Sequence, residues 1–138
     1  MCIRDRHKPI IMGYRTWLSL GRRPLHDRYN LVLGRECKED KKALVEIDES
    51  PQKLLWRALN VSDEVVIIGG TKVYSAFHHI CTRLYITHIH HTFKEANVFH
   101  DAFCRHKLQD MWYCKSSKEI KKSKYNKYDL SLCIYERW

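Results

Sequence analysis

The chain has 138 residues, of which 44% are hydrophobic and 30% charged, a balance typical of one globular domain. No apolar run approaches the roughly 20 residues of a membrane-spanning helix, and the start MCIRDRHK lacks the apolar core of a signal peptide. We therefore expect a cytoplasmic protein without a membrane partner. The net charge of +9, from 25 Lys and Arg against 16 Asp and Glu, favours anionic partners such as phosphorylated cofactors, polycarboxylates or nucleic acid.

The six cysteines indicate free thiols rather than disulfides. No C-x-x-C spacing occurs among them, and the sequence has no secretory context, so a zinc site is not expected either. They are Cys2, Cys37, Cys81, Cys104, Cys114 and Cys133.

The hydrophobic pattern predicts alternating strands and helices, followed by an antiparallel hairpin. Strands are expected at residues 10–12, 30–33, 65–68 and 83–89, with an edge strand at 43–47 and hairpin strands at 111–114 and 128–135. Residues 94–110 read as irregular. Helices are expected from 14 to a stop at Gly21, from 51 to about 60 with Leu54, Leu55, Ala58 and Leu59 as its apolar stripe, and after Gly70 with Val73, Ala76, Phe77 and Ile80 on one face.

The stretch EVVIIGGTKVY (64–74) is the centre of this pattern. A buried strand, two glycines and a helix start place free backbone N–H groups at the strand's carboxyl end, where open α/β sheets bind phosphates. Glycine lets a ligand approach the main chain closely. On this stretch alone an ordinary strand-to-helix turn is favoured, because the G-x-G-x-x-G fingerprint is absent.

Three predicted strands end in glycine followed by a cation, and this repetition is more informative than one turn. The three tips are Gly13 with Arg15, Gly34 with Arg35, and Gly69-Gly70 with Lys72. They predict a single rim of the sheet that gathers an extended anionic ligand.

Other charged features have simpler interpretations. The cationic loop at 22–28 is either solvated surface or an anion clamp, and composition favours the first. Six lysines lie within residues 115–127. Such a run of charges usually forms a solvated surface, so a solvated hairpin face is favoured over a nucleic-acid-binding surface. His88 and His90 share one strand face, but without a third ligand we predict no metal.

Taken together, these segments resemble dihydrofolate reductase. The resemblance rests on HKPIIMGYRTWLSLGRRPL (7–25), DRYNLVLGRE (27–36), EVVIIGGTKVY (64–74), RLYITHIHHTFKEANVFHDAF (83–103) and KYDLSLCIYER (127–137), in the family's order. It implies an α/β fold with a mostly parallel central sheet, flanking helices and an antiparallel C-terminal hairpin. It also implies NADPH-dependent reduction of 7,8-dihydrofolate to tetrahydrofolate, a step of one-carbon metabolism.

The resemblance also implies a cofactor site. Its residues would be Gly13, Tyr14, Arg15, Thr16, Leu33, Gly34, Arg35, Ile68, Gly69, Gly70, Thr71, Lys72, Val73 and Tyr74. Arg35 would bind the 2′-phosphate that distinguishes NADPH from NADH, and Gly69-Gly70 would form a cis peptide. Tyr14 replaces a cation that the family usually has.

For the substrate, the resemblance implies contacts from Ser19, Leu20, Leu25, Arg28, Ile68, Tyr74 and Thr87. Arg28 would bind the α-carboxylate of the glutamate tail, a bidentate contact suited to guanidinium. Thr87 would hydrogen-bond the family's buried catalytic carboxylate.

The start of the chain departs from the family. Residues 1–6 do not resemble the first strand, mobile loop and acid-bearing helix that precede the Lys-Pro motif, and Asp5 is no substitute for that acid. We therefore expect an incomplete single domain over 7–138 behind a possibly foreign 1–6, with no identified catalytic acid. Such a chain is expected to bind NADPH weakly and to reduce dihydrofolate poorly or not at all.

Three alternatives stay open. The riboflavin-pathway reductase shares the fold and cofactor, but Trp17 and Arg28 favour folate. A non-catalytic NADPH-binding remnant differs from the active enzyme only by the absence of the catalytic carboxylate. A basic nucleic-acid-binding module is least favoured, because no recognition motif accompanies the charge. We expect a monomer that acts on small molecules.

Overall fold

The computed structural model of the chain describes residues 4–35, 45–100, 103 and 105–138. These residues belong to two compact units, Met1–Phe77 and His78–Trp138, and each unit has its own sheet. Together the two sheets give the predicted fold class, a parallel sheet with helices followed by antiparallel strands. The prediction of a single domain stays a prediction.

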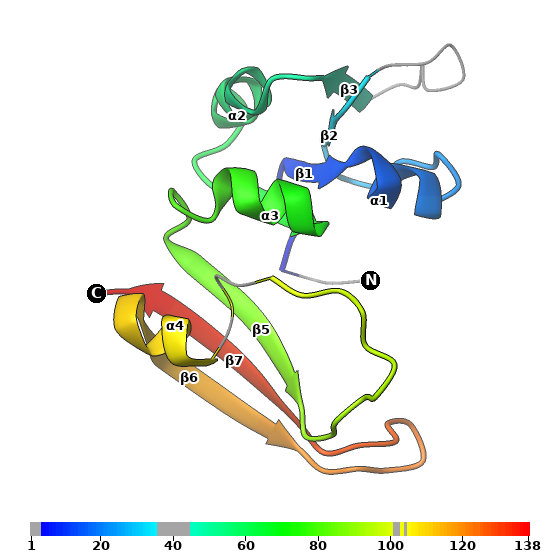
Figure 1. The fold of residues 1–138 in the computed structure, drawn as a ribbon. Helices are drawn as coiled ribbons and strands as arrows, with labels where there is room; N and C mark the ends of the chain where they lie inside the picture. Colours follow the sequence, from blue (N-terminus) through cyan, green and yellow to red (C-terminus); the bar gives the residue numbers. More distant parts are fainter. Residues whose placement is uncertain (1–3, 36–44, 101–102, 104) are drawn as a thin grey trace. The chain divides into compact units, whose positions relative to one another are not determined.

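The first unit is a parallel four-stranded sheet with three helices (Figure 1). Its elements are β1 (Ile10–Gly13), α1 (Tyr14–Ser19), β2 (Asn30–Leu33), β3 (Val45–Asp48), α2 (Pro51–Leu59), β4 (Val66–Gly69) and α3 (Thr71–Phe77). The strand order is β3-β2-β1-β4, with every neighbouring pair parallel. The sequence predicted each of these strands to within two residues, apart from positions 43 and 44, which lie outside the described residues.

The core of this unit lies along β1 and β2. Ile10, Ile11 and Met12 are completely buried, as are Leu31 and Val32. Such unbroken apolar runs are expected of parallel strands covered on both faces. The side chain of Trp17 from α1 is also completely buried, in a cluster with Ile10, Met12, Val32 and Val66.

Helix α2 begins with the expected cap. The Ser50 side chain accepts a hydrogen bond from the Lys53 amide, and Pro51 occupies the first turn. Leu54 and Ala58 are fully buried, whereas Leu59 is half-exposed, so the buried stripe is narrower than predicted.

Helix α3 is shorter than predicted. It ends at Phe77, and Ile80 lies beyond it with 47% of its surface exposed. The prediction that Ile80 shares the apolar face with Val73 and Phe77 is therefore wrong. The apolar spacing continues past the point where the backbone leaves the helix.

The loop between α1 and β2 is held by one buried amide. The Asn30 side chain accepts a hydrogen bond from the Leu25 amide at 2.9 Å and donates to the carbonyls of Leu25 and Arg28 at 3.0 and 2.8 Å. Asn30 is completely buried. One side chain thereby fixes the path of residues 25–30.

The second unit is an antiparallel sheet with one helix. Its elements are β5 (Arg83–Ile89), α4 (Arg105–Met111), β6 (Trp112–Ile120) and β7 (Leu130–Arg137), with strand order β5-β7-β6. Helix α4 contradicts the prediction that 94–110 is irregular throughout. Leu108 and Trp112, four residues apart, bury against Leu84, and this helical spacing is the signal that was missed.

The long strand β6 also differs from the prediction, because it begins at Trp112 and includes Lys115 and Lys118. All six lysines between 115 and 127 are exposed, and the interpretation of this segment as a solvated hairpin face stays a prediction. On β7, Ser131 and Cys133 are buried and Leu132 is exposed. Cys81, Cys114 and Cys133 are free thiols, as predicted; the other three cysteines lie outside the described residues.

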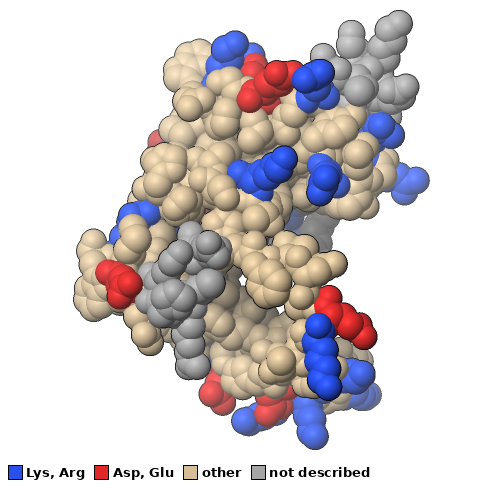
Figure 2. Space-filling model, viewed as in Figure 1, with Lys and Arg blue, Asp and Glu red and all other residues tan. Residues whose placement is uncertain are grey.

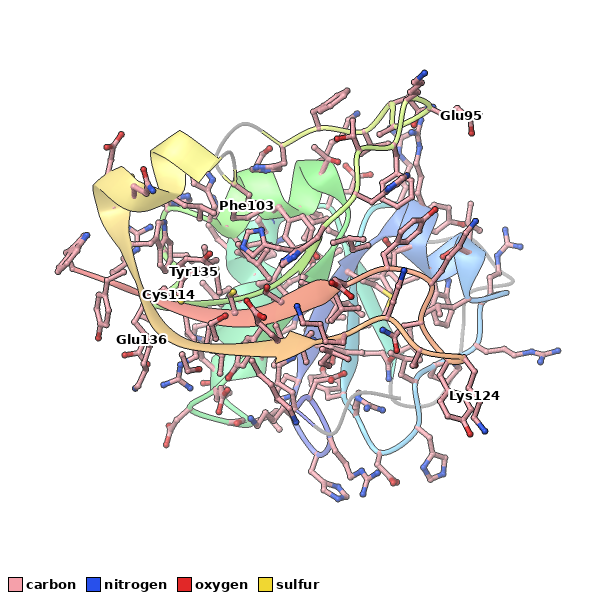
Figure 3. The ribbon with its side chains drawn as sticks, turned by 90° about the horizontal axis from the view of Figure 1, so that it is seen from below. Glu95, Phe103, Cys114, Lys124, Tyr135 and Glu136 are labelled. Carbon is pink, nitrogen blue, oxygen red and sulfur yellow. The ribbon has the colours of Figure 1, made fainter. Side chains whose placement is uncertain are left out.

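Glu136 on β7 is the centre of a charged network at the end of the sheet where α4 joins β6 (Figure 3). Its carboxylate accepts from Lys115 Nζ at 2.8 Å, Arg83 Nε at 3.0 Å and Tyr113 Oη at 3.1 Å. The pKa of Glu136 is lowered from 4.5 to about 2, chiefly by the hydrogen bond from Lys115 and further by those from Arg83 and Tyr113. Together these hydrogen bonds outweigh the effect of burial, which raises the pKa.

No helix within the described ranges is long and apolar enough to cross a bilayer.

Replacing Glu136 tests this network. Because the folded pKa lies below the free value, the stabilisation is complete above about pH 4.5 and is lost as the pH falls through about 2. We expect Glu136→Gln to lower the urea midpoint of unfolding above pH 4.5, with a difference that shrinks towards pH 2. The control Glu119→Gln removes one exposed ion pair, to Lys121 at 3.8 Å, and should have little effect. A Glu136→Gln difference that does not change with pH would contradict this.

Replacing Asn30 tests the loop between α1 and β2. Asn30→Ala leaves three backbone groups without their partner, so we expect the free energy of unfolding to fall by about 2–4 kcal/mol. Chemical denaturation measures the change. Asn60→Ala, an exposed asparagine at the end of α2, should cost no more than about 0.5 kcal/mol. Equal costs for the two variants would refute the role given to Asn30.

Candidate functional site

The ends of β1, β2 and β4 lie at one edge of the first sheet. β1 pairs in parallel with both neighbours, with Gly13 opposite Leu33 and Met12 opposite Gly69. The carboxyl ends of all three strands therefore point the same way. This confirms the predicted rim, which we call the glycine rim and define as residues 13–16, 33–35 and 68–74.

The first two tips are in direct contact with their neighbours through glycine. A Cβ atom on Gly13 would lie 2.9 Å from Val73 Cγ2 and 3.7 Å from the Gly69 oxygen, and a Cβ on Gly34 would lie 2.8 Å from Tyr14 Cβ. No side chain fits at either position without a shift. The end of β1 therefore packs on the start of α3, and the end of β2 packs on the start of α1.

At the third tip the main chain is open. The Gly69–Gly70 peptide bond is cis, as the resemblance implies, and Gly69 has a φ of 107°. A Cβ on Gly70 would find its nearest neighbour, Thr16 Oγ1, at 4.0 Å. Gly70 is exposed, so this side of the backbone can be approached by a ligand.

The three predicted cations of the glycine rim are exposed side chains. Arg15, Arg35 and Lys72 are all exposed, and Arg35 Nε lies 3.0 Å from Glu49 Oε1. Both partners of that pair are largely solvated, so it holds the guanidinium only weakly. In Figure 2 the surface formed by α1, α2, α3 and their strands carries several separate cationic side chains and one group of acidic side chains.

Apolar side chains lie next to the rim. Leu20, Leu25 and Ile68 pack against the Trp17 cluster, and the Ser19 hydroxyl donates to the Thr16 carbonyl at 2.7 Å. The Tyr74 hydroxyl would lie 3.2 Å from a Cβ on Gly69. Burial raises the pKa of Tyr74, so this hydroxyl stays neutral beside the rim.

Arg28 differs from the other predicted cations because it is buried. Its Nε donates to Asp5 Oδ2 at 2.9 Å, and its Nη1 donates to the His26 carbonyl at 2.7 Å. Asp5 is also buried. Sequence reasoning missed Asp5 as a partner, because the segment around it has no periodicity or motif.

Thr87 belongs to the second unit. It lies on β5 opposite Leu132 of β7 and is exposed. On the same sheet, His88 Nε2 contacts the Tyr135 hydroxyl at 2.8 Å and His90 Nε2 contacts the Ser131 hydroxyl at 2.7 Å. Within the described part of the chain, no group of three His, Cys, Asp or Glu side chains is placed to hold a metal.

Comparison with known proteins identifies the family. The family model described as dihydrofolate reductase matches residues 4–137. A dihydrofolate reductase of Buchnera aphidicola subsp. Acyrthosiphon pisum is 32% identical over 133 residues, which make up 95% of this chain and 77% of that protein. The Gallus gallus dihydrofolate reductase is 38% identical over 106 residues, or 70% of this chain and 56% of that protein.

A solved structure agrees with these sequence matches. The dihydrofolate reductase of Enterococcus faecalis, complexed with NADP(H) and RAB-propyl, aligns with a TM-score of 0.76 at 25% identity. The alignment covers 96% of this chain and 75% of that one. With the family model spanning nearly all residues, the chain belongs to the dihydrofolate reductase family.

Proposed function

We propose that the chain carries out the reaction of its family, the NADPH-dependent reduction of 7,8-dihydrofolate to tetrahydrofolate. The observation that carries the proposal is the glycine rim. Three parallel strand tips meet at one edge, two of them without room for a side chain and one with open main chain. An extended molecule with several phosphates fits such an edge, because backbone groups and separate cations can contact it along its length.

The rim residues fit the cofactor. Gly13, Thr16, Gly70 and Thr71 would lie against the pyrophosphate, where a side chain on Gly70 would occupy the open space. Arg35 would bind the 2′-phosphate, and its solvated pair with Glu49 is easily given up. Bound there, NADPH supplies the hydride.

The remaining predicted cofactor contacts follow the same edge. They are Tyr14, Arg15, Leu33, Gly34, Ile68, Gly69, Lys72, Val73 and Tyr74, all in the first unit.

The substrate would lie beside the apolar part of the rim. Ile68, Leu20 and Leu25 offer apolar surface for the pterin ring and exclude water from it. Ser19 and Tyr74 would contact the same ligand, and Arg28 would bind the carboxylate of its glutamate tail. The role of Thr87, on β5 of the second unit, stays a prediction from the resemblance.

Reduction also requires a proton at N5 of the pterin. Of the carboxylates that the structure describes, Asp5 is the buried one, and it is paired with Arg28. Among the described residues we assign no side chain as the proton donor, so water delivers the proton in the proposed reaction. General acid catalysis typically contributes 10²–10⁴-fold to a rate, and turnover without it should be slow.

We further propose a cytoplasmic monomer that acts on small molecules rather than on nucleic acid. The lysines of the hairpin support this, because Lys115 pairs with Glu136 and Lys121 with Asp129. Such charges belong to a solvated face of the protein.

The direct test is turnover. Purified protein, NADPH and dihydrofolate are mixed and the absorbance at 340 nm is followed; we expect a decrease that depends on dihydrofolate but is slower than about 10 s⁻¹. Gly13→Ala places a Cβ 2.9 Å from Val73 Cγ2 and should abolish this decrease in absorbance. Because a contaminating host enzyme would still be active in that preparation, the variant also serves as the control for contamination. If the chain neither binds NADPH, measured by tryptophan fluorescence, nor oxidises it, the proposed function is wrong.

A second prediction concerns the choice of cofactor. Arg35→Gln removes a charge-assisted contact to the 2′-phosphate, so NADPH should bind about tenfold more weakly while NADH binding stays the same. The matched control is Glu49→Gln, which frees the same guanidinium and should not weaken NADPH. Fluorescence titration measures the affinity of the unchanged protein and of both variants for NADPH and for NADH. Equal losses for both cofactors would remove Arg35 from the 2′-phosphate site.

A further inference from the structure

The ion pair between Asp5 and Arg28 joins the segment before β1 to the loop before β2. Arg28 Nε lies 2.9 Å from Asp5 Oδ2, and the side chains of Arg28 and Asp5 are 1% and 5% exposed. Arg4 Nη2 lies 3.9 Å from the second oxygen, Oδ1. The guanidinium thus already has a carboxylate partner inside the protein.

Backbone hydrogen bonds hold Asp5 in this position. The His7 amide donates to the Asp27 carbonyl at 2.9 Å, and the Lys8 amide donates to the Asp5 carbonyl at 3.3 Å. His7 and Asp27 both have left-handed backbone conformations, with φ of 62° and 56°. The segment around Asp5 is therefore fastened to the loop that carries Arg28.

This pairing changes what Arg28 can offer to a ligand. The proposed function gives Arg28 the carboxylate of the substrate's glutamate tail. A second carboxylate brought to the same guanidinium meets the negative charge of Asp5, and like charges placed side by side in an interface are unfavourable. Because both residues are buried, solvent screens this repulsion poorly.

We infer that Asp5 is an internal competitor of the substrate's tail: its carboxylate occupies Arg28 and sets how tightly the protein distinguishes ligands that carry a tail carboxylate from ligands that do not. The inference rests on the proposed function for the identity of the ligand. Asp5 acts through Arg28 and is therefore a positioning residue that tunes specificity. It has no part in the chemical step.

The test compares two ligands and three proteins. Asp5→Asn keeps an oxygen that can accept from Arg28 Nε but removes the negative charge. Dihydrofolate carries the tail, and 6-methyl-7,8-dihydropterin lacks it. We expect Asp5→Asn to bind dihydrofolate about tenfold more tightly than the unchanged protein does, with dihydropterin affinity unchanged.

Asp27→Asn is the matched control. It removes the same charge one residue from Arg28, but its carboxylate contacts His26 Nδ1 at 2.8 Å and is exposed, and asparagine tolerates the left-handed backbone at this position. We expect no change in the ratio of the two affinities. If Asp5→Asn lowers the ratio of dihydrofolate affinity to dihydropterin affinity, or leaves it unchanged, the inference is overturned. If none of the three proteins binds either ligand, the proposed function is overturned as well.

A measurement on the unchanged protein covers the case in which Asp5→Asn does not fold. The Arg28 Nε–H resonance in NMR spectra reports its hydrogen bond to Asp5. Dihydrofolate should shift this resonance and dihydropterin should not. If dihydrofolate binds with the resonance unmoved, Asp5 and the tail do not share Arg28, and the inference fails.

Discussion

The parallel pairing of β1 with β2 and β4, regular along β2 and shifted by one residue between Ile11 and Met12 along β4, is the constraint on which the candidate site depends. Unbroken apolar runs in the first two strands, and a shorter one in β4, bury Ile11, Leu31 and Val66 between the covering helices. A slip by one residue would turn each strand's side chains to the opposite face. Because the core holds the three strands parallel and side by side, their carboxyl ends lie at the same edge of the sheet.

At that edge, close packing and openness have different causes. Gly13 and Gly34 are required by the protein itself, because Val73 and Tyr14 leave no space for a side chain there. At Gly70 the atom nearest to an added Cβ is Thr16 Oγ1, at 4.0 Å, so there is space for a side chain. Two glycines therefore bring the strand tips together, whereas the third leaves main chain uncovered.

The sequence was informative where the signal is local and failed where the signal is long-range. Strand runs, the Ser50-Pro51 cap and the glycine tips depend on adjacent residues, and the structure has them where they were predicted. Helix α4 was missed because its buried positions, Leu108 and Trp112, are meaningful only against Leu84. The partner of Arg28 was missed for a similar reason, since Asp5 lies 23 residues away in a stretch without periodicity.

Arg28 and Arg35 show how burial changes the meaning of one residue type. The resemblance to the family implies an anion for both arginines. Arg35 is 90% exposed, so a phosphate meets a guanidinium that gives up only a weak surface pair. Arg28 is 1% exposed and already neutralised, so any anion must displace or share Asp5. A buried ion pair contributes little net stability but is costly to break from one side. In the proposed function, the affinity of Arg28 for a tail carboxylate therefore depends on the carboxylate that the protein already holds there.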